Sequence, residues 1–250
     1  MTHGAGTWLH CSLPRPAARH LLICFPHAGG SAAFFRNWGV RLTGCEVHAA
    51  RYPGRAERIE EPQPTDLRQL AMDFAKSIEA IADRPIALFG HSMGAVVALE
   101  AARVLEARGV RIVRLFASGS QHGPCSVRHA ELVDEDDDAV AEQLVQLGGT
   151  QREMAVDPIF RELVLPSVRA DGQMFHAYEM SMAPRLRCPV TTIVGDADLQ
   201  ADTRPWSDLA PTGFEERTVS GDHFYLIAHP PFAVLRACLD ASANAEAPAP

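Results

Sequence analysis

The chain has 250 residues, 47% of them hydrophobic and 22% charged, which is the composition of a globular protein large enough for an α/β domain. Its formal charge of −8 at pH 7 argues against nucleic acid as the main partner. The six cysteines show no C-x-x-C spacing, so we expect no metal or redox site, but free thiols in a reducing cytoplasm. No signal peptide is recognisable and no apolar stretch reaches ~18 residues, so we expect no membrane partner.

Short apolar runs alternate with helical patterns through the first half of the chain. Thr65–Asp83 carries apolar residues at three- and four-residue steps, which predicts a helix that starts near Asp66. Ala95–Arg108 is a second predicted helix, without a helix breaker before the following glycine. This alternation predicts a mostly parallel sheet covered on both faces. The predicted strands are Leu21–Phe25, Val47–Ala50, Ile86–Phe89 and Ile112–Ala117.

The alternation stops between residues 120 and 187. Asp134–Leu147 predicts a helix with an acidic first turn, and Asp157–Met180 predicts a helical stretch interrupted at Pro166 and Gly172. Strands resume at Val190–Val194 and Phe214–Val219, before an apolar C-terminal helix. We therefore expect a core made of residues 1–119 and 188–250, with residues 120–187 inserted as a helical lid over the ligand-binding edge of the sheet.

Residues 89–94, F-G-H-S-M-G, place Ser92 between two glycines at a strand-to-helix junction. A G-x-S-x-G match is a weak signal alone, but this junction is where a nucleophile elbow exposes a serine hydroxyl. The N-terminus of the following helix favours developing negative charge beside it. We therefore interpret Ser92 as a nucleophile; the alternative is a structural serine that caps its helix.

A nucleophilic serine needs a base, and hydrolases built on such an elbow order their residues Ser, Asp, His along the chain. His223 stands in S-G-D-H-F-Y, just after a predicted strand, and is the candidate general base. His229 is a weaker candidate because it lies in or just past a helical start. His91 adjoins the serine, but its side chain is expected to point away and to brace the turn.

The carboxylate that orients the base is sought in T-T-I-V-G-D-A-D, residues 191–198, where a predicted strand ends. Asp198 is preferred because it lies three residues after the glycine, and Asp196 remains the alternative. Asp222 is next to the histidine in the chain, an arrangement that rarely gives the needed hydrogen bond. No metal or organic cofactor is required by this chemistry.

Residues 25–31, F-P-H-A-G-G-S, form a glycine-rich turn after the first strand. Such a turn can aim a backbone N–H group at the elbow. The N–H groups of Ala28 and Met93 are the candidate oxyanion donors. The alternative is an ordinary turn between a strand and a helix.

These motifs together resemble the type II thioesterases, stand-alone α/β-hydrolases that accompany polyketide synthases and non-ribosomal peptide synthetases. The resemblance rests on F-P-H-A-G-G-S, R-Y-P-G-R-A-E-R-I-E-E-P (residues 51–62), G-H-S-M-G and G-D-H-F-Y-L, and it runs from about Leu21 to Leu239. It implies an α/β-hydrolase fold with a helical lid. It also assigns the nucleophile, base and acid to Ser92, His223 and Asp198.

The resemblance further implies a substrate held as a thioester on the phosphopantetheine arm of an acyl carrier or peptidyl carrier protein, and a monomeric enzyme. Apolar residues of the lid could line an acyl channel, or could simply pack the lid onto the core: Phe160, Leu163, Met174, Phe175, Met180 and Met182. The cluster of Arg51, Arg55 and Arg58 is either a structural loop with surface arginines or part of an edge that meets an acidic carrier.

Two other functions remain open from the sequence. A carboxylesterase or lipase would use the same three residues on free oxygen esters. A non-catalytic binding module on a hydrolase scaffold would keep its function when Ser92 is replaced. The sequence does not specify the length or branching of the acyl group.

Overall fold

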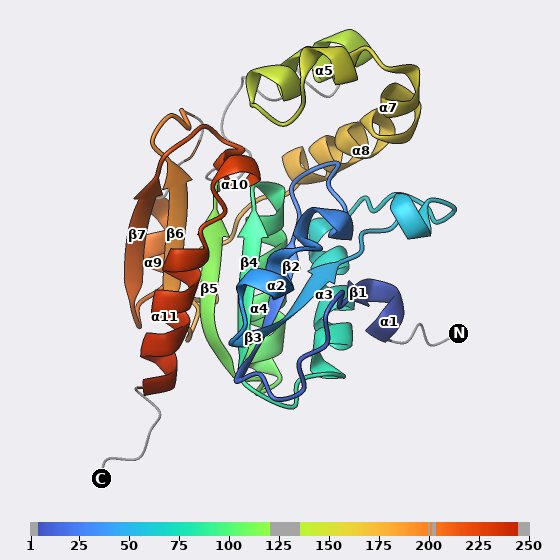
Figure 1. Ribbon diagram of the computed structural model, residues 1–250. Helices are drawn as coiled ribbons and strands as arrows, with labels where there is room; N and C mark the ends of the chain where they lie inside the picture. The colour runs from blue at the N-terminus through green and yellow to red at the C-terminus, as the bar shows by residue number, and fades with distance from the viewer. Residues whose placement is uncertain (1–4, 121–135, 200, 202–203, 245–250) are drawn as a thin grey trace.

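The computed structural model describes residues 5–120, 136–199, 201 and 204–244. A seven-stranded sheet forms its centre, in the order β1-β3-β2-β4-β5-β6-β7 (Figure 1). All neighbouring strands are parallel except β1, which pairs antiparallel with β3. The strands are β1 (Leu9–His10), β2 (His20–Phe25), β3 (Cys45–Ala50), β4 (Ile86–His91), β5 (Ile112–Ser118), β6 (Val190–Gly195) and β7 (Phe214–Val219).

The apolar runs form the predicted strands because they are buried on both faces. Every residue of the central strands β2, β4 and β5 is buried, as expected for a covered parallel sheet. β4 extends to His91, so the strand reaches the elbow directly. β1 was not predicted, because two residues are too few to show a periodic pattern.

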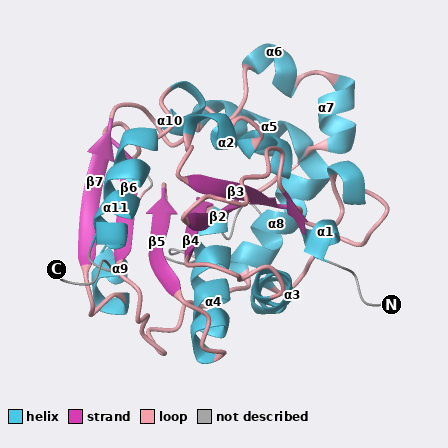
Figure 2. Ribbon diagram, turned by 60° about the horizontal axis from the view of Figure 1, so that its bottom comes forward, coloured by secondary structure: helices cyan, strands magenta, loops and turns pink. Residues whose placement is uncertain are grey.

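Helices cover both faces of the sheet (Figure 2). One core cluster joins the sheet to α3 (Leu67–Glu79), α4 (Met93–Ala107) and α9 (Arg204–Leu209), and a second joins the opposite face to α2 (Trp38–Arg41) and α11 (Phe232–Asn244). The predicted helix start is confirmed, since the carboxylate of Asp66 accepts the N–H of Gln69 at 2.9 Å. The shorter elements are α1 (Ala5–Trp8), η1 (Ala32–Phe35), η2 (Ala56–Arg58) and α10 (Tyr225–Ala228).

Four helices from the insertion lie over the carboxyl ends of the strands (Figure 1). They are α5 (Asp137–Gln146), α6 (Arg152–Ala155), α7 (Pro158–Leu163) and α8 (Leu165–His176), and together they are called the helical cover. Asp136 caps α5, whereas the predicted start at Asp134 lies outside the described residues. In the part of the chain that the structure describes, no helix has both the length and the apolar character that a membrane span needs.

Proline explains where the second predicted helix of the insertion divides. Pro166 stands in the first turn of α8, where the missing N–H costs no helical hydrogen bond, so the chain ends α7 and starts a new helix there. Gly172 lies inside α8 and does not interrupt it, so the prediction of a break at this residue is wrong.

Candidate active site

Ser92 occupies a strained turn between β4 and α4. Its backbone angles, φ 55° and ψ −123°, lie in a region that non-glycine residues avoid, at a cost of about 1–3 kcal/mol. The two glycines of the motif are required by close approach: a Cβ on Gly90 would lie 2.1 Å from the carbonyl oxygen of Gly94, and a Cβ on Gly94 would lie 2.3 Å from that of Phe25. The predicted elbow is therefore the observed geometry.

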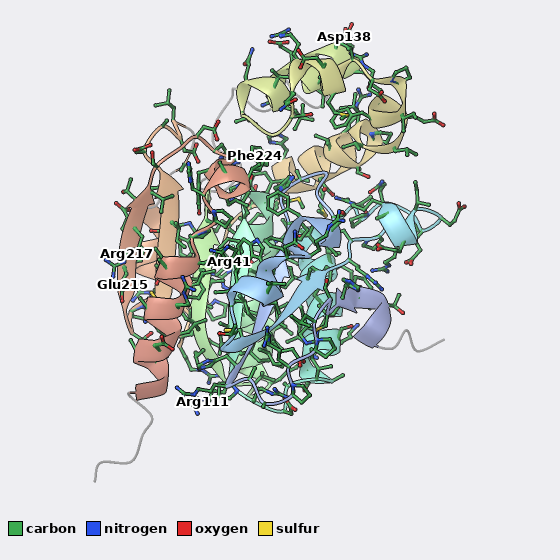
Figure 3. All side chains as sticks on the ribbon, viewed as in Figure 1. Arg41, Arg111, Asp138, Glu215, Arg217 and Phe224 are labelled. Atoms are coloured by element: carbon green, nitrogen blue, oxygen red, sulfur yellow. The ribbon has the colours of Figure 1, made fainter. Side chains whose placement is uncertain are left out.

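A cavity of about 120 Å³ lies over the elbow, between the strand-end loops and the helical cover. Its lower wall comes from the loops after β2, β4 and β7, and its upper wall from α5 and α8. The labelled Phe224 lies where α10 faces the cover (Figure 3). The lower lining residues are His27, Ala28, Ser92, Met93, His223 and Phe224; the upper ones include Val140, Gln143, Leu144, Val168, Gln173 and Phe175.

His223 pairs with one of the three candidate acids. Its Nδ1 lies 2.8 Å from Oδ2 of Asp198, and the two side chains are only 4% and 1% exposed. Asp196 instead accepts the backbone N–H of Gly221, and Asp222 accepts that of Phe224, each at 2.9 Å. With Nδ1 engaged, Nε2 is the imidazole nitrogen left to exchange a proton with Ser92, which lines the same cavity.

His91 is fully buried beside the elbow, and its Nδ1 lies 2.9 Å from Oγ of Ser118, which in turn lies 2.7 Å from the hydroxyl of Tyr225. Burial, with the nearby positive charges of other histidines, lowers its pKa well below the usual value, so its ring is neutral. The ring centre of His91 lies 5.0 Å from that of His223. His91 thus braces the turn and also packs on the candidate base. His229 is exposed at the end of α10.

His27, from the glycine-rich turn after β2, also lines the cavity. Its ring packs edge-on against Phe224, with centres 4.7 Å apart. Burial, followed by the charges of His223 and Arg55, lowers its pKa from 6.5 to about 3. A neutral ring therefore stands beside the turn that carries Ala28.

The two candidate oxyanion donors meet at the cavity. Ala28 lies in the turn after β2, where the N–H of Gly30 bonds the carbonyl of His27 at 2.9 Å, and Met93 opens α4. Within the residues that the structure describes, neither the Ala28 nor the Met93 N–H has an acceptor in the protein. Both residues line the cavity with Ser92. Two free N–H groups, one of them at the start of α4, are suited to bind an anion.

The cover residues proposed for the acyl channel separate into two groups. Phe175 lines the cavity. Phe160 instead packs in a small cluster inside the cover, while Met174 and Met180 pack on the main core, so these three expectations are corrected. The reason is helical phase: Met174 is only 2% exposed and is buried in the core, whereas its neighbour Phe175 packs on the same core and also reaches the cavity. Leu163 and Met182 are exposed.

The arginine cluster is not a surface patch. Arg55 and Arg58 are only 4% and 6% exposed, so the expectation of surface arginines is wrong for both. Arg58 bonds Glu61 through Nε at 2.8 Å and stacks over the ring of Trp8. Arg55 forms an ion pair with Asp171 of α8. The loop is structural, and it reaches into the helical cover.

One described group of side chains could share a metal ion by distance. The ligand atoms of Cys11, Glu46 and His48 lie within 4.8 Å of one another near β1 and β3. Both oxygens of Glu46 are already used, one with Nε2 of His48 and one by the backbone N–H of Arg15. This group does not line the cavity, so it has no part in the chemistry at Ser92.

Comparison with known proteins identifies the family. The model of the thioesterase domain family matches residues 20–241. A probable cadicidin biosynthesis thioesterase from Streptomyces griseus is 34% identical over 229 residues, which are 90% of this chain; the chain spans 63% of that relative's length.

Solved structures agree. The type II thioesterase BorB from the borrelidin biosynthetic cluster is 33% identical, with a TM-score of 0.84 over 96% of this chain and 100% of its own. YbtT, a type II thioesterase from the yersiniabactin pathway of mixed peptide and polyketide synthesis, is 30% identical, with a TM-score of 0.82 over 94% and 99%. The resemblance inferred from the four motifs is thereby confirmed. The chain belongs to the thioesterase domain family and has its α/β-hydrolase fold.

Proposed function

We propose that this chain hydrolyses acyl thioesters held on the phosphopantetheine arm of acyl carrier or peptidyl carrier proteins, and so clears stalled or incorrect acyl groups. The observation that carries the proposal is the geometry at the cavity: Ser92 on its strained elbow shares the cavity with His223, whose Nδ1 is bonded to the buried Asp198. The type II thioesterases among its similar structures support the choice of substrate.

In the first half of the proposed reaction, Nε2 of His223 takes the hydroxyl proton of Ser92 as Oγ attacks the thioester carbonyl. The N–H groups of Ala28 and Met93 stabilise the oxyanion of the tetrahedral intermediate. Asp198 holds the imidazole in the reactive orientation and stabilises its charged form. The C–S bond then breaks, the thiol of the arm leaves with the proton from His223, and an acyl-serine remains.

In the second half, water replaces the thiol. His223 takes a proton from water as its oxygen attacks the acyl-serine carbonyl, and returns that proton to Oγ as the ester bond breaks. The products are a carboxylic acid and free Ser92. All proton transfers use residues of this chain.

We propose that residues 120–187 act as the lid of this site. Support comes from α5 and α8, which form the upper wall of the cavity. A thioester attached to a carrier protein must reach Ser92 from outside, so these helices have to leave or open a path for the arm.

Further support concerns the working state of the enzyme. Ser92, His223 and Asp198 all come from one copy of the chain, so the proposed chemistry needs no second copy. The five described cysteines are free, which favours the reducing cytoplasm as the compartment.

The proposal is tested by comparing acyl carrier proteins loaded with acyl thioesters against p-nitrophenyl esters of the same acids. We expect higher kcat/KM for the carrier-bound thioesters, and mass spectrometry of quenched reactions should find the acyl group on Ser92. Ser92→Ala should abolish both. A clear preference for the simple esters would indicate a carboxylesterase instead. Turnover that survives Ser92→Ala would refute the nucleophile.

A further inference from the structure

Asp171 is a fully buried carboxylate on α8 that the proposed reaction does not use. It forms a bidentate ion pair with Arg55, with Nη1–Oδ2 at 2.5 Å and Nη2–Oδ1 at 2.7 Å. Its Oδ2 also accepts the backbone N–H of Gly29 at 2.8 Å. One side chain therefore joins three segments: a cover helix, the arginine loop and the turn that presents Ala28.

Neighbouring contacts hold the same turn, defined here as residues 26–30. Gly29 has φ +74°, and a Cβ there would lie 2.3 Å from Cγ2 of Val168, so α8 packs directly on the turn. The hydroxyl of Tyr52 donates to the carbonyl of Pro26 at 3.0 Å. Inside the turn, the N–H of Gly30 bonds the carbonyl of His27 at 2.9 Å, and Asp171 supplies the side-chain acceptor for the peptide that follows Ala28.

The bond to Gly29 acts on Ala28 through the peptide plane. The N–H of Gly29 and the carbonyl of Ala28 belong to one planar unit, so the direction of that N–H sets ψ of Ala28. Oxyanion donors work at about 2.7–3.1 Å from the developing charge, and a misplacement of about 1 Å can cost roughly 10²-fold in rate. The plane that carries the Ala28 N–H is held by the bond from the Gly30 N–H to the His27 carbonyl, and Asp171 holds the adjoining Ala28–Gly29 plane, so the two bonds together fix the aim of the Ala28 N–H.

We propose that Asp171 is a positioning residue for the oxyanion turn, with Arg55 as the cation that makes its burial tolerable. The proposal rests on the oxyanion role of Ala28 in the proposed function. Without Asp171, the N–H of Gly29 would lose its acceptor beneath α8, and the turn would have to rotate to find another. The cover helix thus completes the site from above, through backbone geometry and without touching the substrate.

The test compares two double variants that differ only in the acceptor offered to Gly29. Arg55→Met with Asp171→Asn removes the buried charges and keeps a side-chain oxygen at the turn. Arg55→Met with Asp171→Leu removes the charges and the oxygen while keeping similar volume. We expect the leucine variant to have kcat at least about tenfold below the asparagine variant, with little change in KM; loss of one whole donor, roughly 10²–10³-fold, is the ceiling.

A second readout isolates the oxyanion. A trifluoromethyl ketone analogue of the acyl thioester adds to Ser92 and forms a tetrahedral oxyanion, so its Ki should rise by the same factor as kcat/KM falls. A thioether analogue with CH2 in place of the thioester carbonyl offers no oxygen to the oxyanion donors, and its Ki should stay unchanged. A merely structural role would weaken both ligands alike, and that result would overturn the proposal.

Glu100→Gln is the matched control. Glu100 is another buried carboxylate on a helix, paired with Arg103 at 2.8 Å and accepting the hydroxyl of Tyr178 at 2.6 Å, but it does not line the cavity. Its replacement should lower stability and leave the Ki of the ketone unchanged. Equal kcat in the two double variants would also overturn the proposal.

Two further measurements keep the outcomes separable. Ser92 of the wild type should be labelled by a fluorophosphonate; if it is not, the proposed function fails rather than the role of Asp171. Should the leucine variant not fold, amide hydrogen exchange of the wild type provides the decision. The Gly29 N–H should be protected to the level of α8, and exchange as fast as an unbonded amide would refute the bond on which the proposal depends.

Discussion

The two walls of the cavity are stabilised differently. In the lower wall, the polar side chains are buried and paired: Asp198 with His223, and His91 with Ser118. In the outer part of the cover, α5–α7, ion pairs lie in solvent; Asp138, which pairs with Arg161, is 79% exposed and lies on the outer side of α5 (Figure 3). Buried pairs are costly to break, whereas exposed pairs contribute little.

Helix α8 is part of the inserted segment, but it is held by buried polar contacts like those of the lower wall. Its Asp171 is buried with Arg55, and its Ser167 accepts the side chain of Gln63 at 3.0 Å. The rest of the cover, α5–α7, packs on α8 through a small apolar cluster around Val140, Ala155 and Leu165. Burial of the partner atoms, rather than membership of the insertion, therefore divides the firmly held part of the cover from the part that we propose opens.

The largest effect is expected in the lower wall. Asp198→Asn should lower kcat by about 10⁴-fold, because the imidazole loses its orienting acceptor, whereas Asp196→Asn, which caps a backbone N–H, should lower it far less. Steady-state kinetics of both variants measure the difference. If the two losses were equal, the assignment of the acid would be wrong.

The second largest effect is expected at the ion pair between Arg55 and Asp171, which holds α8. Arg55→Met should lower the free energy of unfolding by about 3–5 kcal/mol, because it leaves the carboxylate of Asp171 buried without a cation. Adding Asp171→Asn should recover most of this loss, since the uncompensated charge is removed. Denaturant unfolding of the two variants and the wild type provides the numbers. If Arg55→Met were as stable as the wild type, the contacts of α8 would be as weak as those of α5–α7.

The buried histidines of the lower wall should make stability depend on pH. Burial lowers the pKa of His27 to about 3 and that of His91 well below its usual value, so both stay neutral in the folded protein while the unfolded chain protonates them below about pH 6.5. Their contribution to the free energy of unfolding is complete above pH 6.5. It is lost as pH falls from 6.5 towards 3, because the unfolded state then binds more protons than the folded state.

His91→Gln tests this dependence, since His91 is fully buried. Between pH 6 and pH 5 the wild type should lose stability more steeply than the variant, by up to about 1.4 kcal/mol per pH unit. Denaturant unfolding at several pH values measures both slopes. Parallel slopes would show that His91 titrates normally in the folded protein.

The smallest effect is expected in the outer cover. Asp138→Asn breaks the exposed pair with Arg161 and should change the free energy of unfolding by less than about 1 kcal/mol. Raising the salt from 0.1 M to 1 M should remove even that difference, because the Debye length falls from about 10 Å to about 3 Å. A loss as large as that of Arg55→Met would erase the contrast between the two parts of the cover.

Much of this protein is determined by its sequence alone. Apolar runs predict five of the seven strands, β2 to β6, to within about two residues, because strands covered on both faces of a sheet are largely apolar. The two glycines beside Ser92 predict the elbow, since no other residue fits where the strand and helix backbones meet. The spacing after the sixth strand also selects Asp198 as the partner of His223.

Other features depend on how distant parts of the chain come together. The sequence could not show that Met174 is buried wholly in the core while Phe175 also reaches the cavity, because an apolar residue suits either side of a helix between two apolar surfaces. Nor could it join Arg55 to Asp171, which lie 116 positions apart. Charged side chains are ordinarily predicted at the surface, and only folding brings these two close enough for each to make the burial of the other tolerable.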